Sequence, residues 1–317
     1  MRTGIPTTVL ATALACSLGT APANARARTF VASYGNDGNP CTFGSPCRNF
    51  QQAVNVVDAG GEVTAIDSAG FGPISINKSV TITSPDGVEA GIVPVLGGNA
   101  ITINAGSSDA IGLRGLTIDG AGGALNGIVF TTGGSLTVQN CVIRNLTGQG
   151  INFVSTTPSS LSVSHTYVGN NGGYGILVKP SGSAAATAVF NHVEAQYNGA
   201  NAYGIALDGS LTTGAVSGTA TDTVSSNNGG GFLAQGNSGT GGNGSLMVVR
   251  SLAANNHTGV SAGINSGIFP SVLRISQTTI TGNVVPCDSF QVQSYKDNIV
   301  NNNQQQDTCS NIPMSPE

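Results

Sequence analysis

Residues 136–145 read LTVQNCVIRN, and this stretch sets the pattern of the chain. Its apolar residues alternate with small polar ones before a closing asparagine, which is typical of a strand with one buried face. The pattern returns as LSVSH at residues 161–165 and as AVFNH at residues 188–192. A pattern that recurs at a period of roughly 20–50 residues predicts a solenoid.

Two further markers keep this period over six copies. One is a glycine before an apolar residue: Gly127, Gly150, Gly175, Gly204, Gly231 and Gly259. The other is a closing asparagine, with spacings of 25, 28, 29, 28 and 28 residues: Asn145, Asn170, Asn198, Asn227, Asn255 and Asn283. Each copy has room for three short strands that stack one repeat apart, and parallel crossovers are right-handed in about 98% of cases. The predicted fold is therefore an all-β, right-handed parallel β-helix.

Composition narrows the class of protein. A hydrophobic fraction of 39% is enough to form a core, despite 46 glycines. The net charge of −4 provides no basic surface, so we expect no nucleic-acid partner. No apolar run reaches the length of a membrane span, and we expect no transmembrane segment.

The first 25 residues have the features of a signal peptide. Arg2 precedes an apolar stretch at residues 9–18, and small residues around Ala25 offer a cleavage site, with Ala27 as the alternative. We therefore expect a bacterial protein that is secreted, periplasmic or on the cell surface. Lipidation of Cys16 remains open.

Export would place the remaining cysteines in an oxidising compartment. Cys41 and Cys47 bracket one loop, and Cys287 and Cys309 bracket the last segment, so each pair can form a disulfide. Cys141 lies in an apolar strand and its state is open. No cysteine or histidine spacing suggests a metal site, and no cofactor is expected.

One helix is predicted. Apolar residues at positions 50, 53, 54 and 57 follow helical spacing, and a single amphipathic helix before an array suits a cap. The expected organisation is a signal peptide at 1–25, a strand and capping helix at 26–61, a β-helix at 62–309 and a disordered tail at 310–317.

The glycine–apolar pairs, the segment at 136–145 and the asparagines resemble the right-handed parallel β-helix proteins of the pectin-lyase-like superfamily. The resemblance covers roughly residues 29–303. It implies the fold and leaves the activity open, because the superfamily includes lyases, hydrolases, epimerases, tailspikes and adhesins. The chain lacks the Asn-Thr-Asp and Gly-His-Gly motifs of polygalacturonases, the Arg-x-Pro-x-x-Arg of pectate lyases and the Asp-Pro-His of alginate epimerases.

One column of polar residues is the candidate site. Alignment on the closing asparagines places five residues in register: Asn140, His165, His192, Asp222 and Arg250. A histidine beside an aspartate suits acid–base catalysis, so His165, His192 and Asp222 are the catalytic candidates, with Asn140 and Arg250 as binding candidates. The alternative is an exposed bend whose unusual dihedrals favour asparagine, histidine and aspartate.

Other candidates have simpler alternatives. Tyr174 and Tyr203 precede consecutive glycine anchors and form either a sugar-binding face or a stabilising ladder. Asp119 and Asp208 are possible catalytic acids, but each precedes a glycine, as turn aspartates do. GTGGNG at residues 239–244 matches a nucleotide-binding motif without the helix it needs, and we interpret it as a loop.

The leading hypothesis is a secreted β-helix protein that binds polysaccharide or another surface without catalysis. The alternative is a lyase or hydrolase that acts on acidic polysaccharide with an atypical site. A purely structural rod is the third possibility.

Overall fold

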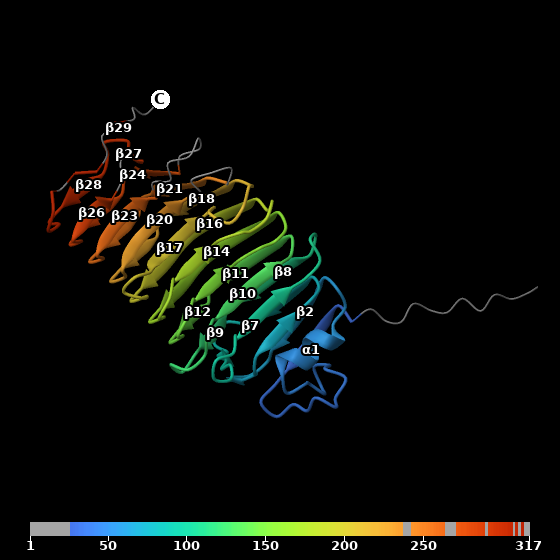
Figure 1. Cartoon of the computed structure of the whole chain (residues 1–317). Helices are drawn as coiled ribbons and strands as arrows, with labels where there is room; N and C mark the ends of the chain where they lie inside the picture. Colours follow the sequence, from blue (N-terminus) through green and yellow to red (C-terminus); the bar gives the residue numbers. More distant parts are fainter. Residues whose placement is uncertain are drawn as a thin grey trace, which may run out of the picture.

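The computed structural model describes residues 26–236, 242–263, 271–288, 291–306, 308–309 and 312–313. The predicted signal peptide and part of the GTGGNG loop lie outside these ranges. Within them, short strands wind into a single elongated solenoid with the helix α1 (Phe50–Val56) at one end and the strand β28 (Ile299–Asn301) at the other (Figure 1). The fold is all-β and parallel, as predicted.

The first face of the solenoid is a nine-stranded sheet in the order β26-β23-β20-β17-β15-β13-β10-β7-β4. From β4 to β26, each strand of this sheet comes from the next coil along the chain. The strands are β4 (Ile74–Ile76), β7 (Ile101–Asn104), β10 (Ile128–Thr132), β13 (Ile151–Phe153), β15 (Ile176–Val178), β17 (Tyr203–Asp208), β20 (Gly230–Gln235), β23 (Thr258–Ala262) and β26 (Val285–Asp288).

The remaining strands form two faces that meet at a bend. One face holds β1 (Arg28–Val31), β2 (Gly61–Ala65), β5 (Val80–Thr83), β8 (Ala110–Arg114), β11 (Ser135–Gln139), β18 (Val216–Thr221), β21 (Gly244–Val249), β24 (Val272–Ser276), β27 (Val292–Ser294) and β29 (Ile312–Pro313). The other holds β3 (Ala69–Gly70), β6 (Ala90–Ile92), β9 (Leu116–Asp119), β12 (Val142–Arg144), β19 (Val224–Ser226), β22 (Leu252–Ala254), β25 (Thr279–Thr281) and β28 (Ile299–Asn301). β14 (Ser159–Gly169) and β16 (Ala186–Gln196) run through the bend and join both faces.

The register is what places functional side chains. Leu136 pairs with Leu161, and Val138 pairs with Val163, so equivalent residues of successive repeats lie in columns along the axis. Inward columns are apolar and fully buried; Phe130 and Phe153, for example, stack with ring centroids 4.3 Å apart. The outward columns therefore present equivalent side chains once per coil, so one ligand can contact several of them.

The six closing asparagines belong to two different columns, so their interpretation as one repeating position was wrong. Asn145, Asn170, Asn227 and Asn255 have left-handed backbones at an exposed bend, with φ between 55° and 59°. Asn198 and Asn283 belong to a neighbouring buried ladder, in which each side-chain amide donates to the next side-chain oxygen over 2.9–3.2 Å: Asn171, Asn198, Asn228, Asn256, Asn283 and Asn303. Sequence spacing alone did not separate two asparagine positions that are adjacent in the chain.

The glycine anchors are required by close approach between coils. A Cβ on Gly150 would lie 2.6 Å from the carbonyl oxygen of Gly175 in the next coil and even closer to the core side chain of Val168. Such contacts are too short for any larger residue. The recurring glycine is therefore needed for the close spacing of the coils and has no role in binding or catalysis.

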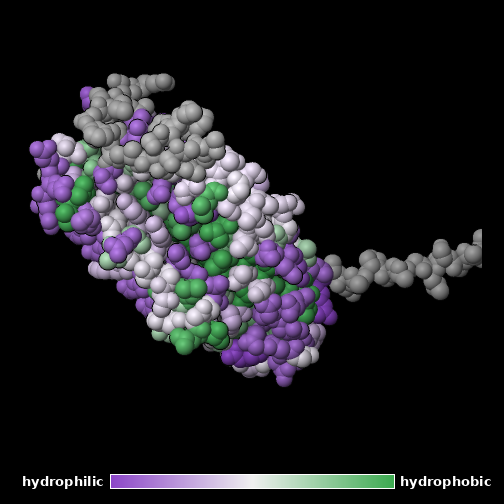
Figure 2. Space-filling view, viewed as in Figure 1, coloured by the Kyte–Doolittle hydropathy of each residue, from purple (hydrophilic) through white to green (hydrophobic). Residues whose placement is uncertain are grey.

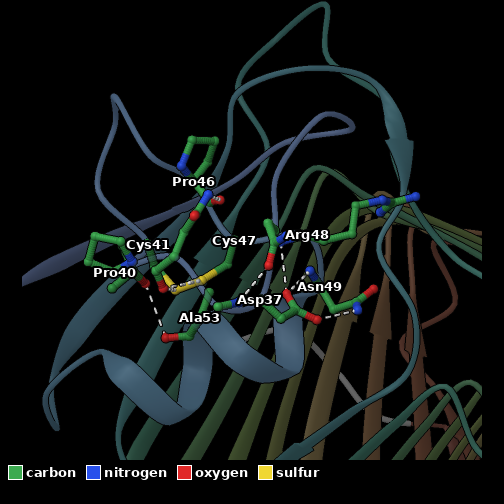
Figure 3. The surroundings of a disulfide bond; sticks show 12 residues. Asp37, Pro40, Cys41, Pro46, Cys47, Arg48, Asn49 and Ala53 are labelled. Carbon is green, nitrogen blue, oxygen red and sulfur yellow. Dashed lines mark hydrogen bonds between the residues drawn. A yellow bond between two sulfur atoms is a disulfide. The ribbon is translucent and has the colours of Figure 1, made fainter.

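The helix α1 (Phe50–Val56) lies at the N-terminal end, where it contacts β1, β2 and β4 (Figure 1). Phe50, Ala53 and Val54 are buried, as the helical spacing predicted. Beside it, a disulfide joins Cys41 and Cys47 (Figure 3).

The Asp37 carboxylate organises this N-terminal loop. Partial burial raises its pKa, but hydrogen bonds donated by Asn49 and Arg48 outweigh that effect and lower the pKa overall (Figure 3). The ionised carboxylate therefore holds the loop against the start of α1.

A second disulfide, Cys287–Cys309, lies near the C-terminal end, so both predicted pairs are formed. Cys141 is a free, buried thiol, and burial raises its pKa to about 11. Of the predicted tail, only Ile312 and Pro313 are described, and they pair with β27. In the described part of the chain, no helix is long and apolar enough to span a membrane.

Candidate functional site

The five column residues lie together at the bend between the second and third faces. All have left-handed backbones, with φ between 46° and 52°: Asn140, His165, His192, Asp222 and Arg250. Apart from glycine, few residues adopt this conformation, and asparagine, aspartate and histidine are the most frequent among them. Their side chains point outward from successive coils, so the alignment that placed them in one column holds in space.

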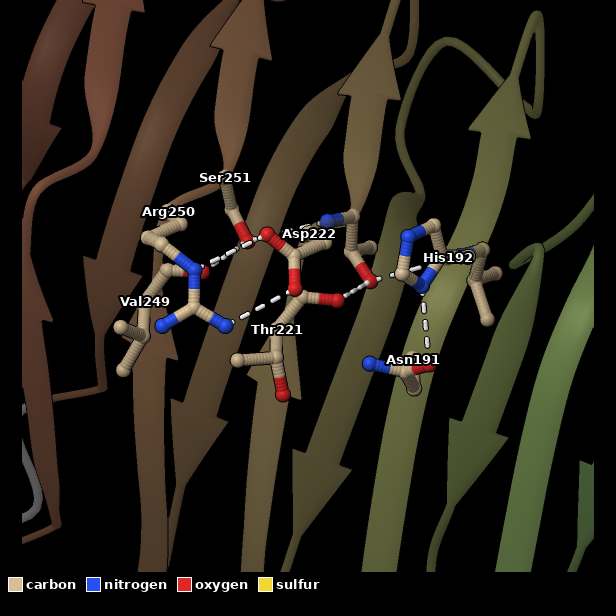
Figure 4. Close-up of polar contacts among 9 residues, drawn as sticks. Asn191, His192, Thr221, Asp222, Val249, Arg250 and Ser251 are labelled. Carbon is tan, nitrogen blue, oxygen red and sulfur yellow. Dashed lines mark hydrogen bonds and ion pairs between the residues drawn. The ribbon is translucent and has the colours of Figure 1, made fainter.

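The two histidines stack on each other. The ring centroids of His165 and His192 are 4.9 Å apart and the ring planes differ by 4°. Nδ1 of His192 lies 2.8 Å from Oδ1 of Asn191, its neighbour in the chain (Figure 4). The hydrogen bond that orients this imidazole therefore comes from an amide.

The carboxylate of Asp222 pairs with Arg250. Nε of Arg250 donates to Oδ1 over 3.0 Å and Nη2 donates to Oδ2 over 2.9 Å (Figure 4). These hydrogen bonds, and to a smaller extent the nearby His192, lower the pKa of Asp222. The column brings histidine and aspartate close, but the aspartate is bound by arginine, and its catalytic role remains a prediction.

A shallow groove of about 490 Å³ lies beside the histidines. Its walls include Asn140 at the bend, and Tyr167 and Glu194 on the third face. Burial raises the pKa of Tyr167, and the charge of Glu194 raises it further. Glu194 accepts a hydrogen bond from Gln196 over 3.0 Å, so the groove contains one carboxylate without a facing partner of the same kind.

Tyr203 lies across the exterior of the nine-stranded sheet. A Cβ added to Gly230, in the next coil, would strike the tyrosine ring, so the ring covers that glycine. Its hydroxyl reaches Ser261, two coils further on. The ring of Tyr174 is nearly parallel to it, at 15°, with centroids 6.5 Å apart. Burial is the main cause that raises the pKa of both phenols.

An apolar strip lies beside the two tyrosines. Strand alternation turns Leu177 outward between two core residues, and register stacks it with Ala206 and Leu233. These three residues form a second hydrophobic cluster, separate from the core, against which Tyr174 and Tyr203 pack. We call the three aliphatic residues and the two tyrosines the tyrosine platform.

An ion pair borders the platform. Nζ of Lys179 lies 2.9 Å from Oδ2 of Asp208, whose side chain is only 9% exposed. Oδ1 of Asp208 accepts the backbone N–H of Ser210, the geometry of a turn aspartate. Lys179 and Asp208 therefore neutralise each other, while the exposed carboxylate of Asp288 lies further along the same face, in the column of Leu233 and Ser261.

Asp119 has the same kind of structural role. Its carboxylate accepts the backbone N–H of Ala121 and the side chains of Asn145 and Arg144. The turn interpretation accounts for both aspartates. Within the described ranges, no group of three or more histidine, cysteine or acidic residues could hold a metal ion.

The sequence reasoning missed Tyr197. This residue occupies the left-handed asparagine column, between Asn170 and Asn227, with φ of 54° and 56% of its surface exposed. Because the alignment uses Asn198 as the closing asparagine of this repeat, it does not place Tyr197 in the left-handed column. The signal was available, because a shift of one residue in that copy places a tyrosine where its neighbours have asparagine.

Comparison with known proteins supports the fold. Residues 64–192 match the family model of a domain of unknown function, DUF4957. The crystal structure of pectate lyase Pel9A is similar with a TM-score of 0.59 and 15% identity, over 86% of this chain and 79% of that one.

The chain shares the parallel β-helix fold of that lyase. XylC in complex with xylose gives a TM-score of 0.49 at 9% identity, over 80% of this chain and 69% of that one. A rhamnogalacturonan lyase gives 0.40 at 13% identity, over 80% and 74%. Sequence comparison with curated proteins finds no match. The similarity to pectate lyase Pel9A confirms the resemblance to pectin-lyase-like proteins for the fold.

Proposed function

We propose that this protein is an extracellular β-helix that binds polysaccharide on the exterior of its nine-stranded sheet, without catalysis. The observation that carries the proposal is the tyrosine platform, where Tyr174 and Tyr203 lie on an apolar strip outside the core. A sugar ring has an apolar C–H face that packs on aromatic rings, while its hydroxyls need hydrogen-bonding partners nearby.

The surroundings of the platform supply such partners. The Lys179–Asp208 pair lies at the border of the strip. Leu177, Ala206 and Leu233 are at most 8% exposed, so the half-buried rings of Tyr174 and Tyr203 form the surface that a polymer contacts. Because the two rings belong to successive coils, this surface suits an extended polymer that lies along the axis.

The candidate column supports binding better than catalysis. A general base needs a free carboxylate or an imidazole that a carboxylate orients. Asp222 makes two hydrogen bonds to Arg250, and His192 is oriented by the amide of Asn191. Neither arrangement prepares a proton acceptor.

Substitution of Tyr174 by leucine tests the proposal. Leucine keeps the apolar cover over the strip but removes the aromatic face, so we expect polysaccharide affinity to fall about fivefold with an unchanged circular dichroism spectrum. Binding is measured on a glycan array and by titration calorimetry. Tyr34→Leu is the matched control, because Tyr34 is 70% exposed at the N-terminal end. Equal affinity of Tyr174→Leu and wild type would exclude the platform.

The second candidate is a lyase or hydrolase of acidic polysaccharide. It is favoured by the fold shared with pectate lyase Pel9A and by two exposed imidazoles beside a groove. This function predicts unsaturated uronates or new reducing ends from a polysaccharide panel, and their loss in His192→Asn. Absence of product from every polymer would eliminate it.

Export and capping complete the proposal. The two disulfides fit an oxidising compartment, in agreement with the signal features of residues 1–25. We infer a right-handed coil whose N-terminal end is capped by α1, since Phe50 and Val54 are buried there against the first strands.

A further inference from the structure

We propose a second carbohydrate site, centred on Tyr197, that takes an uncharged polysaccharide. It lies at the exposed asparagine bend and is separate from the tyrosine platform. It rests on the proposed function only in assuming that the protein meets polysaccharide. Three independent features of the bend carry the inference: backbone strain, an exposed aromatic ring and a row of neutral amides.

The backbone conformation of Tyr197 is unfavourable for its side chain. Its φ of 54° is shared by residues that tolerate it, Asn170 in the preceding coil and Asn227 and Asn255 in the following ones. In the described part of the chain, no other tyrosine or phenylalanine has a positive φ. Strained residues cluster at functional sites, and asparagine would relieve the strain at this position.

The strain is not explained by packing. Tyr197 is 56% exposed, so its ring covers little of the core. Its backbone N–H donates to Ser226 in the next coil, a hydrogen bond that any residue would make. The side chain therefore contributes something other than stability.

The surroundings of the ring form an open cavity of about 510 Å³. Asn227, Asn255, Ala200 and His257 line it with Tyr197, while the buried asparagine ladder forms its floor. Asn255 is exposed, and its amide makes no hydrogen bond with the described residues. Each such amide offers both donors and an acceptor, which suits vicinal hydroxyls.

The chemistry of the cavity selects an uncharged ligand. None of its lining residues is a carboxylate, lysine or arginine, so an acidic polymer would find no compensating charge. The amides recur once per coil, about 4.8 Å apart along the axis. A neutral chain that lies along the bend can therefore stack one sugar on Tyr197 and hydrogen-bond the next to Asn227 or Asn255.

The substitution Tyr197→Asn separates binding from folding. It restores the residue found in neighbouring coils, so we expect the thermal midpoint to stay or to rise by roughly 2–4 °C. Binding of neutral oligosaccharides (hexamers of glucose, xylose, mannose and galactose) should weaken about tenfold or more. Tyr197→Phe, which keeps the ring, should retain most of the affinity, and Asn255→Gly, which keeps the left-handed backbone, should lose part of it.

The controls distinguish this proposal from the first. Tyr34→Asn should change nothing, and Tyr174→Leu should leave binding at Tyr197 intact. Neutral-sugar affinity that is unchanged in Tyr197→Asn would overturn the second site alone, and so would a preference for oligogalacturonate that Tyr197→Asn abolishes. If no saccharide binds the wild-type protein, both proposals fail. A lower thermal midpoint in Tyr197→Asn would contradict the strain argument.

Discussion

At the scale of single residues, backbone conformation explains most of what looked like chemistry in the sequence. The left-handed backbone at the first bend accounts for the asparagine, the histidines and the aspartate of the column, but it accounts neither for Arg250 nor for the stacking of the two histidines. The second bend shows the reverse case. There the geometry favours asparagine, and Tyr197 is present despite it.

Cys141 provides a residue-scale prediction about pH. Burial raises the pKa of its thiol to about 11, so the thiol stays protonated in the folded protein at pH 8. In the protein without residues 1–25, which removes Cys16, iodoacetamide at pH 8 should leave the native state unmodified. It should label one thiol after unfolding in denaturant with the disulfides intact, read by mass spectrometry.

The linked effect on stability has a definite sign. Because the folded pKa lies above the ordinary value near 9, the contribution of Cys141 is fully present below that value and is lost as pH rises toward about 11. Cys141→Ala should remove this alkaline dependence. Rapid labelling of the native protein at pH 8 would show that the thiol is accessible.

At the scale of elements, the asparagine ladder joins consecutive coils more specifically than the strands alone. The side-chain oxygen of Asn228 accepts both the backbone N–H and the side-chain amide of Asn198, over 2.9 and 3.0 Å. Asn228 in turn donates to Asn256. One side chain thus satisfies buried groups in two coils.

Removal of Asn228 should therefore be costly. Asn228→Ala leaves two donors of Asn198 buried without an acceptor, and we expect a loss of about 3 kcal/mol in the free energy of unfolding. Urea denaturation measures it. The control is Asn301→Ala, at an exposed position of β28, which should change stability by less than about 0.5 kcal/mol. Similar losses in the two variants would mean that the ladder has no special role.

The elements also show how far sequence reasoning reaches. Alternation and repeat length predicted the parallel coils, the helix at Phe50–Val56 and the column of His165 and His192. The partner of Asp222 was not predictable, because the choice between His192 and Arg250 depends on side-chain reach and not on register. The outward apolar strip was missed because an aliphatic residue inside an apolar strand reads as core on either face.

At the scale of the whole molecule, contacts join each coil to its neighbours, so stability is approximately a sum along the axis. In the space-filling view, hydrophobic residues are exposed along the middle of the viewed face, between hydrophilic residues at its two ends (Figure 2).

The ends of such an array are where unwinding begins. The two disulfides lie close to them.

The disulfides should accordingly stabilise the ends unequally. Chain entropy predicts about 3 kcal/mol for Cys287–Cys309, with a sequence separation of 22, and about 2 kcal/mol for Cys41–Cys47, with a separation of 6. We expect the double variant Cys287→Ala/Cys309→Ala to have the lower thermal midpoint of the two double variants. The opposite order would show that the N-terminal loop, with Asp37 and α1, limits unfolding.

The constant register of the coils fixes the distances between surface positions along the axis. Because equivalent residues advance by one strand spacing per repeat, about 4.8 Å, any two surface features are separated by a whole number of steps along the axis. Insertion or removal of one complete repeat between two binding positions would change their distance by one such step and leave each position intact. The length of polymer that the protein spans is therefore adjustable by repeat number, independently of the residues that hold it.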